Sequence, residues 1–402
     1  MSMETPKISV IMPTLNVKTY IEECVDSVVN QTLSDIEIII VDAGSTDGTL
    51  EILKDYETKD SRITLLHSDK KSYGYQMNLG ISKACGNYIG IVETDDYIDS
   101  RMFERLYQLS NNKYCDIVKS NFIYVNEYKD KIFKDSNKCK KKIPENEIFN
   151  LKDDAHILVG HPSIWSAIYN RDFLLSNDIK FMEAPGGGWV DNPFFFETLC
   201  LAKTIRYTDE AYYYYRESNP NSSSNKLTDI TLPIRRMLDN LDVLDKYPEC
   251  KTEGVLKATY WRVNVYMDNI EKRYAFHENY AVVEPYIYEM MDRLEEPVVK
   301  NFFNAKQQKR YYSIITPVDR LENGEIINVP SFTYTKIKRE VRYYKRTVKS
   351  QEKKIKKLKK QNKKLKKENK KLKKTKKSYD SLLNSSSWKI TKPLRSLFNL
   401  FR

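Results

Sequence analysis

Short apolar runs alternate with amphipathic segments four times within about the first 95 residues, and this alternation constrains the fold more than any other feature of the chain. The apolar runs predict buried strands over 8–12, 36–41, 63–67 and 88–92. The segments between them predict helices over 18–31, 49–56 and 77–84, the first capped by Asn16. Strands that alternate with helices pair in parallel, so the pattern indicates an α/β fold in which helices flank a mainly parallel sheet.

Polar residues follow three of the predicted strands at the point where each strand ends. They are Pro13 and Thr14 after the first strand, Asp42 after the second, and the segment 93–96 (Glu-Thr-Asp-Asp) after the fourth. Ligands in parallel sheets bind in the crevice at the carboxyl ends of the strands, so we expect these residues to meet there. Adjacent carboxylates such as Asp95 and Asp96 suit Mg²⁺ or Mn²⁺. The alternative for Asp96 is that it caps a helix beginning near Ser100.

The net charge of +12 comes from one segment, because residues 351–377 hold sixteen lysines and two glutamates. The rest of the chain is near neutral, so the charge does not indicate a nucleic-acid partner. The four histidines are scattered, which argues against a histidine metal site. The six cysteines lack CxxC spacing and are expected to be free thiols.

Hydropathy favours a protein that stays in the cytoplasm. We find no run of about 20 apolar residues that would span a membrane. A basic segment followed by an apolar run and a cleavage site is also missing from the start of the sequence. We therefore expect cytoplasmic location, at most peripheral at the inner face of the plasma membrane.

Composition divides the chain into four predicted parts. Residues 1–225 form the predicted α/β domain, in two halves (1–125 and 126–225), and a lysine-rich loop or edge excursion is expected over 125–150. Residues 226–336 predict a mainly helical extension that ends in a polar connector with Pro317 and Pro330. Residues 337–380 predict a coiled coil, and residues 381–402 an amphipathic tail.

The coiled-coil prediction rests on a heptad pattern from 341 to 379, in which leucines recur at every seventh position. Asn362 and Asn369 on the seam favour a parallel homodimer through residues 341–379. The lysine-rich exterior suits an anionic membrane surface, and Trp388, Phe398 and Phe401 suit an interfacial anchor. The alternative is a solvated helix that contacts nothing.

Four segments carry a family resemblance: SVIMPTLN, IEIIIVDAGSTDGT, GYQMNLGISKACGNYIGIVETDDYID and, later, WVDNPFFFETL. As a set, the first three spanning roughly residues 7 to 100, they resemble family 2 glycosyltransferases of the GT-A fold, of the type that builds bacterial cell-surface polysaccharides. The resemblance implies inverting transfer of a sugar from a nucleotide diphosphate sugar, with UDP as the favoured carrier. The acceptor would be a hydroxyl of a saccharide or lipid-linked molecule, and Mn²⁺ or Mg²⁺ would be the cofactor.

The resemblance makes residues 1–225 a catalytic domain, with a nucleotide-binding half (1–125) and an acceptor half (126–225). It also implies roles for residues near the donor. Pro13, Thr14 and Asp42 would hold the nucleoside, although Ala43 stands where the family has a second acidic residue. Asp95 would face the ribose or the metal, and Asp96 would ligate the metal. Gln76, two positions before Asn78, stands where the family often has an arginine, and both residues are placed near the diphosphate.

The second half of the resemblance supplies the acceptor chemistry. Asp191 matches the family's catalytic base, and the glycines 186–188 would give a mobile approach to it. The alternative is that Asp191 caps the helix that Pro193 leads. Arg216 would supply a cation to the diphosphate, or lie on a strand surface. His161 is either a buried hydrogen-bonded histidine or an acceptor contact.

Two further functions compete with the glycosyltransferase. A nucleotidyltransferase shares the strand–helix alternation but needs a glycine-rich basic loop after the first strand, which PTLNVKTY lacks. A catalytically degenerate binding or scaffold protein that assembles through its coiled coil is the second. Ala43, Gln76 and Glu93, which depart from the family pattern, keep that reading open.

Overall fold

The computed structural model describes residues 5–111, 114–128, 131–136, 142–219, 229–274, 282–322, 325–330 and 332–385. The chain forms two compact units, Met1–Pro330 and Ser331–Arg402. The division into parts at 225, 336 and 380 stays a prediction.

The nucleotide-binding half contains the four predicted strands, all parallel. Their order across the sheet is β3 (Ile63–His67), β2 (Ile36–Asp42), β1 (Ile8–Thr14) and β4 (Tyr88–Ile91). Every residue of β1 is buried, as expected of a strand covered on both faces. The register pairs Thr14 with Asp42 at the carboxyl ends, so the sheet places these ends side by side as predicted.

The three predicted helices are present as α1 (Ile21–Val29), α2 (Thr49–Lys59) and α3 (Tyr73–Lys83), with shifted boundaries. Asn16 is not the cap of α1. Its backbone is left-handed (φ 53°) and its side chain accepts a hydrogen bond from the Thr46 amide at 2.8 Å. Helix α3 begins four residues before the predicted start, because the Ser72 hydroxyl accepts from the Tyr75 amide and caps it there.

The same sheet continues with mixed pairing. Beyond β4 the order is β9 (Ala167–Asn170), β6 (Ile117–Tyr128), β10 (Ile205–Arg216) and β5 (Tyr97–Ile98). Strand β9 is antiparallel to both its neighbours, whereas β10 runs parallel to β6. In the 125–150 segment β6 continues into an antiparallel hairpin with β7 (Lys131–Ser136), and β8 (Ile148–Phe149) pairs with β10. Helices α4 (Met102–Leu109) and α5 (Arg171–Ser176) pack against these strands, and α6 (Asp191–Leu201) precedes β10 in the chain.

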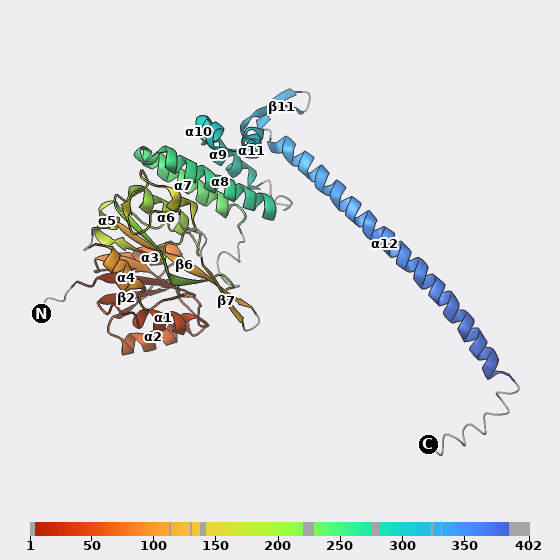
Figure 1. Cartoon of the computed structure of the whole chain (residues 1–402), viewed down its shortest axis with the longest axis horizontal. Helices are drawn as coiled ribbons and strands as arrows, with labels where there is room; N and C mark the ends of the chain where they lie inside the picture. Colours follow the sequence, from red (N-terminus) through yellow and green to blue (C-terminus); the bar gives the residue numbers. More distant parts are fainter. Residues whose placement is uncertain are drawn as a thin grey trace, which may run out of the picture. The chain divides into compact units, whose positions relative to one another are not determined.

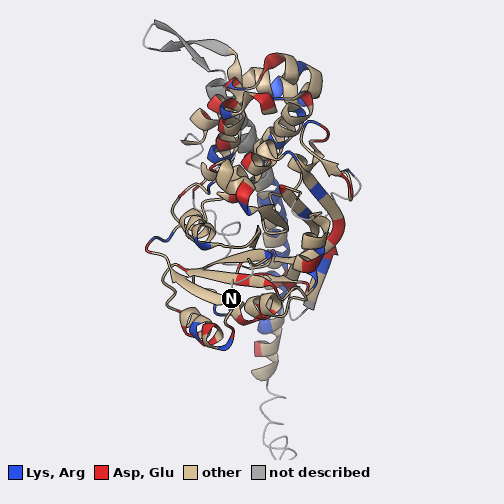
Figure 2. Ribbon diagram, turned by 90° about the vertical axis from the view of Figure 1, so that its left-hand side faces the viewer, with Lys and Arg blue, Asp and Glu red and all other residues tan. Residues whose placement is uncertain are grey.

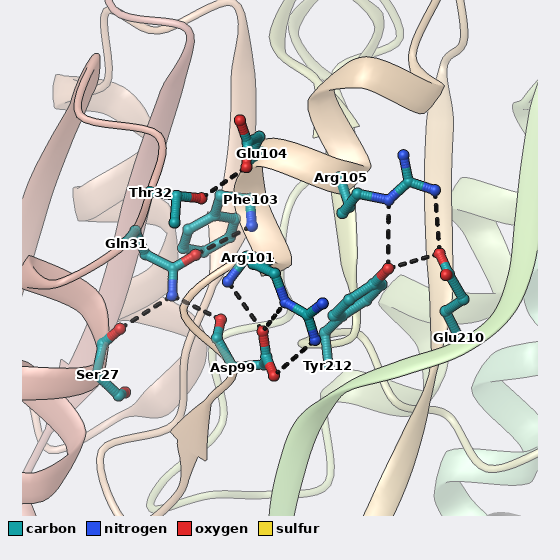
Figure 3. A network of polar contacts seen from close by, with 10 residues as sticks. All are labelled: Ser27, Gln31, Thr32, Asp99, Arg101, Phe103, Glu104, Arg105, Glu210 and Tyr212. Atoms are coloured by element: carbon teal, nitrogen blue, oxygen red, sulfur yellow. Dashed lines mark hydrogen bonds and ion pairs between the residues drawn. The ribbon is translucent and has the colours of Figure 1, made fainter.

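A polar network fixes the chain just after the Asp95–Asp96 segment (Figure 3). The Gln31 amide donates to the backbone carbonyls of Ser27 and Asp99 and accepts from the Phe103 amide at 3.1 Å. Helix α4 starts at Met102 after the cap residue Arg101, so Asp96 does not cap it. The network instead ties the segment to α1 and leaves Asp96 available to the crevice.

The helical extension begins with α7 (Leu232–Lys246), a turn η2 (Pro248–Cys250) and α8 (Glu253–Tyr274). Helix α7 packs against α6, and α8 packs against α7 (Figure 1). Helix α8 also packs against the turn η1 (His156–Val159), which precedes β9 in the chain. Three shorter helices follow: α9 (Glu284–Asp292), α10 (Glu296–Phe302) and α11 (Ala305–Ile315). The predicted polar connector is wrong, because Pro317–Glu322 and Glu325–Pro330 pair as an antiparallel hairpin, β11–β12. In Figure 2 acidic and basic residues are interspersed over the elements of this unit.

The second unit is described as one helix, α12 (Phe332–Leu383), which contains the whole heptad segment. The seam leucines Leu358, Leu365 and Leu372 are 53%, 60% and 65% exposed in the single chain. Residues 386–402, with Trp388, Phe398 and Phe401, lie outside the described residues. Among the helices that are described, none combines the length and apolar character needed to cross a membrane.

Candidate active site

A cleft of about 710 Å³ opens at the carboxyl ends of β1 and β4 and receives side chains from both halves of the sheet. Its donor-side lining comes from β1 and from the segments after β1 and β4, and its other wall comes from the 161–165 segment, the glycine loop and α8. The predicted site residues that line it are Pro13, Thr14, Gln76, Asp95, Asp96 and Asp191.

Glu93, Asp95 and Asp96 form an acid cluster on the cleft. Asp96 is buried, and its two carboxylate oxygens accept from the Tyr213 hydroxyl at 2.9 Å and from the Arg216 amide at 2.7 Å. Asp95 accepts from the Asn219 amide at 2.8 Å, and Glu93 accepts from the Tyr73 hydroxyl at 2.6 Å. Strand β10 and the loop after it therefore hold a cluster that begins at the end of β4.

Burial raises the pKa of each carboxyl group in the acid cluster. The pKa of Glu93 rises to about 8, and that of Asp96 rises well above its ordinary value, with the neighbouring Asp95 adding to the effect. The pKa of Asp95 also rises through burial, although Asn219 and Arg216 oppose the rise. Carboxylates that are desolvated beside one another have an excess of negative charge, which a cation would offset.

Asp191 is the first residue of α6 and faces the acid cluster across the cleft. Its cap residue is Val190, which makes no side-chain cap bond, and Asp191 does not occupy the capping position. Burial raises the pKa of Asp191 to about 6, against an opposing hydrogen bond from the Asn192 amide. A carboxyl group with a pKa near neutrality suits a general base.

The glycine loop before Asp191 is held at one end. The Gly186 carbonyl accepts from the Tyr73 amide at 3.0 Å, and the Gly186 amide donates to the Lys71 carbonyl at 2.9 Å. Gly186, Gly188 and Trp189 all have left-handed backbone, which a tryptophan adopts at a cost. The buried indole N–H of Trp189 has no hydrogen-bond partner among the described residues. These hydrogen bonds tie the Gly186 end of the loop to the start of α3, and the mobile approach to Asp191 stays a prediction.

His161, Trp165 and Tyr215 line the cleft together and form an aromatic wall. The Trp165 ring stacks on Tyr215 with centroids 5.3 Å apart, and His161 lies 5.5 Å from Tyr215. Burial lowers the pKa of His161 to about 3, so the imidazole is neutral at physiological pH. Aromatic rings of this kind can pack against the apolar face of a sugar.

Three predicted donor contacts are engaged elsewhere and do not line the cleft. The buried Asp42 carboxylate accepts from the amides of Gly44 and Ser45, and these hydrogen bonds stabilise the turn that follows β2. Asn78 exchanges two hydrogen bonds with the backbone of Phe181, at 2.8 and 2.9 Å. The Arg216 guanidinium, 4% exposed, pairs with Glu23 at 2.6 Å and Glu127 at 3.0 Å. These partners come from distant segments, so the diphosphate cation predicted at Arg216 is not placed on the cleft.

Thr14 and Gln76 both line the cleft, and their predicted contacts with the donor stay predictions. The Gln76 amide donates to the carbonyls of Thr14 and Val41 at 3.0 and 2.6 Å, and so bridges the ends of β1 and β2. This side chain shapes the crevice rather than supplying the charge of the family's arginine.

The structure adds cleft residues that the sequence reasoning missed: Lys18, Lys71, Tyr73, Asn219 and Tyr266. Lys18 and Lys71 supply positive charge to the cleft. Gln76 carries no charge, and the charge of Arg216 is paired with two glutamates. No local pattern could have found Tyr266, since it comes from α8, far along the chain. The described residues contain no group of three or more His, Cys, Asp or Glu side chains able to hold a metal ion alone.

Sequence comparison gives a family match over residues 9–174, which fit the model for glycosyl transferase family 2. These residues are therefore similar to family 2 glycosyltransferases. The glycosyltransferase EpsJ of Bacillus subtilis is 35% identical over 223 residues, which are 54% of this chain and 62% of EpsJ. This chain therefore covers less than two thirds of that relative. A poly(ribitol-phosphate) beta-glucosyltransferase of Bacillus spizizenii is 41% identical over 115 residues, 28% of this chain and 18% of the relative.

Structure comparison bears on the fold of the chain. The crystal structure of S. aureus TarS 1–349 in complex with UDP-GlcNAc superposes with a TM-score of 0.58 at 19% identity. The match covers 80% of this chain and 95% of the TarS fragment. The predicted GT-A fold, with a large sheet flanked by helices and a C-terminal helix, is therefore confirmed, although the sheet is parallel throughout only over β1 to β4 and mixed beyond them.

Proposed function

We propose that this protein is an inverting glycosyltransferase that moves a sugar from a UDP-sugar to a hydroxyl group of a saccharide or lipid-linked acceptor. The observation that carries the proposal is the placing of Asp191, a carboxyl group with a pKa of about 6, across one cleft from the acid cluster. The name of one relative, a poly(ribitol-phosphate) beta-glucosyltransferase, supports cell-surface polysaccharide synthesis as the setting.

The reaction follows from the two sides of the cleft. At neutral pH Asp191 is mostly ionised, so it can accept the proton of the acceptor hydroxyl as the oxygen attacks the anomeric carbon. The bond from that carbon to the diphosphate breaks on the opposite face, and UDP leaves. A single displacement of this kind inverts the configuration. Glu93, with a pKa of about 8, stays protonated and does not compete as the base.

The acid cluster fits a divalent cation that is completed by the donor. Asp95 and Asp96 would hold Mn²⁺ or Mg²⁺, and phosphate oxygens would supply further ligands, as is common for Mg²⁺. The raised pKa values of both aspartates support this, since a cation would stabilise their charged forms. Such a cation neutralises charge that develops on the leaving diphosphate. Lys18 and Lys71 are placed to contribute to the same end.

The proposal is tested by measuring UDP release from UDP-glucose, UDP-galactose and UDP-N-acetylglucosamine, with Mn²⁺ and with EDTA. We expect release from at least one donor, its loss with EDTA, and loss of metal-dependent donor binding in Asp96→Ala. Asp239→Asn, which alters a partly buried carboxyl group on α7 outside the cleft, serves as the control. Normal donor binding by Asp96→Ala would refute the metal assignment.

The scaffold alternative draws on Asp42, Asn78 and Arg216, whose side chains are all engaged in internal bonds. A scaffold of this kind would bind no nucleotide sugar. Calorimetry of UDP binding with and without Mn²⁺ separates the two functions: binding in neither condition would favour the scaffold.

The helix α12 supports a homodimer through residues 341–379. Its seam leucines are exposed in the single chain, and two copies in parallel would cover them. Its lysines would instead be drawn to an anionic membrane. Salt separates these contacts: screening should strengthen a dimer that brings lysines together and weaken binding to anionic vesicles. Dissociation of the dimer by salt would contradict the heptad pairing.

A further inference from the structure

Helix α8 lies outside the residues matched by the family model, yet two of its side chains reach the site. Arg262 and Tyr266 are four residues apart and so lie on one face of the helix. Tyr266 lines the cleft, and Arg262 is buried behind it. Both donate to the same acceptor, the Asn192 side-chain oxygen, at 3.0 Å from Arg262 Nη2 and 2.8 Å from the Tyr266 hydroxyl.

This pair of bonds decides which way the Asn192 amide points. A guanidinium has only donors, so the atom beside it must be the amide oxygen rather than the nitrogen. The Asn192 nitrogen then faces Asp191 and donates to its carboxylate at 3.4 Å. Arg262 and Tyr266 thereby turn a neutral side chain into an oriented donor for the base.

The other arm of Arg262 reaches the aromatic side of the cleft. Its Nη1 donates to the carbonyls of Leu158 and Gly160, at 2.9 and 3.0 Å, next to His161. One side chain therefore bonds the segment that carries the base and the segment that leads into the aromatic wall. With five donors in a rigid plane, arginine can span these acceptors where lysine cannot span them all.

We propose that Arg262 and Tyr266 are positioning residues for the transfer reaction, which orient Asn192 and through it the base Asp191. The inference rests on the proposed function. Helix α8 is then part of the active site. The residues matched by the family model need the helical extension that contains α8 for full activity.

The electrostatic surroundings of Asp191 make the inference measurable. The charged and titratable groups that act on it are Arg262 and Tyr266 from α8, Tyr73 from α3 and Glu93 from the segment after β4. Arg262 and the Asn192 amide favour the ionised form of Asp191 and lower its pKa, against the larger effect of burial. Removing either influence should raise the pKa of Asp191, so a variant should lose more activity at pH 6 than at pH 8.

The test uses Tyr266→Phe, which removes only the hydroxyl that bonds Asn192. The matched control is Tyr260→Phe on the same helix, whose buried hydroxyl accepts from the Glu295 amide at 2.5 Å, away from the cleft. With the full-length chain and UDP-glucose or UDP-N-acetylglucosamine as probe, we measure UDP release against pH. We expect kcat of Tyr266→Phe at pH 6 to fall about threefold to tenfold, the scale of one hydrogen bond, with an unchanged donor KM.

Arg262→Gln and Arg262→Lys extend the test. The first removes the charge and should shift the acidic limb of the profile to higher pH, whereas the second keeps the charge and should restore part of that shift. Circular dichroism and UDP calorimetry check that each variant folds and binds. If Tyr266→Phe matches Tyr260→Phe in both kcat and pH profile, the positioning role is refuted while the proposed function stands. If the parent releases no UDP from any probe and binds none, the proposed function fails, and this inference falls with it.

Discussion

The substitution Asp191→Asn removes one ionisable group from the cleft and keeps the shape of the side chain. The folded protein holds this carboxyl group at a pKa of about 6, above the ordinary 3.8, chiefly through burial. Between these two values the folded state binds more protons than the unfolded state, so stability falls as pH rises from about 4 to about 6. Above pH 6 the ionised carboxylate is a constant cost to the folded state.

The size of that cost follows from the pKa difference. A difference of about two corresponds to about 3 kcal/mol, and contact with solvent in the cleft reduces this to about 2 kcal/mol. Asparagine carries no charge, so Asp191→Asn should be more stable than the parent at pH 7.5. Relative to the parent, its advantage should be smaller at pH 5 by about 1 kcal/mol, because the parent is then mostly protonated at this site.

Urea denaturation of parent and variant at pH 5 and pH 7.5 measures this difference, and UDP release measures function. We expect donor binding to survive and transfer to fall by at least about a hundredfold, as for loss of a positioned base. The control Asp239→Asn should keep transfer. If the difference in free energy of unfolding between the parent and Asp191→Asn is the same at pH 5 and pH 7.5, the desolvation of the carboxyl group is refuted. Near-normal transfer by the variant would refute the role of Asp191 as base.

Three further predictions test other parts of the molecule. Gly74→Ala would place a Cβ 2.0 Å from the Met182 carbonyl oxygen, so we expect the free energy of unfolding, measured by urea denaturation, to fall by about 1–3 kcal/mol. In the control Gly254→Ala the new Cβ would lie 3.6 Å from its nearest neighbour, so the free energy of unfolding should hardly change. Lys71→Ala should weaken UDP binding about tenfold in calorimetry through lost phosphate contact, unlike Lys70→Ala, whose ammonium pairs with Glu183 outside the cleft. Leu365→Asn should shift a dimer to monomer in analytical ultracentrifugation, whereas Lys367→Asn, off the seam, should not; equal behaviour of the two variants would contradict pairing through the leucines.

The sheet could be predicted because its signal is local. The runs that became β1 to β4 are short and mostly apolar, and the segments between them repeat apolar residues at helical spacing. The sequence therefore indicated the crevice and the acid cluster, since the order of strands and helices determines where strand ends meet. It did not reveal the β11–β12 hairpin, in a segment whose prolines suggested a connector.

The partners of individual side chains were decided by the tertiary structure alone. The Asp42 carboxylate bonds the loop that follows it, and the Arg216 guanidinium pairs with Glu23 and Glu127. The family resemblance predicts that both side chains contact the donor. Tyr266 and Lys71 reach the cleft from positions that no motif marks. The physical reason is that a buried polar group bonds whatever partner packing brings near, and those partners lie up to 193 residues away in the chain. Hydrophobic periodicity along the chain determined the framework, whereas long-range packing decided which side chains of that framework face the cleft.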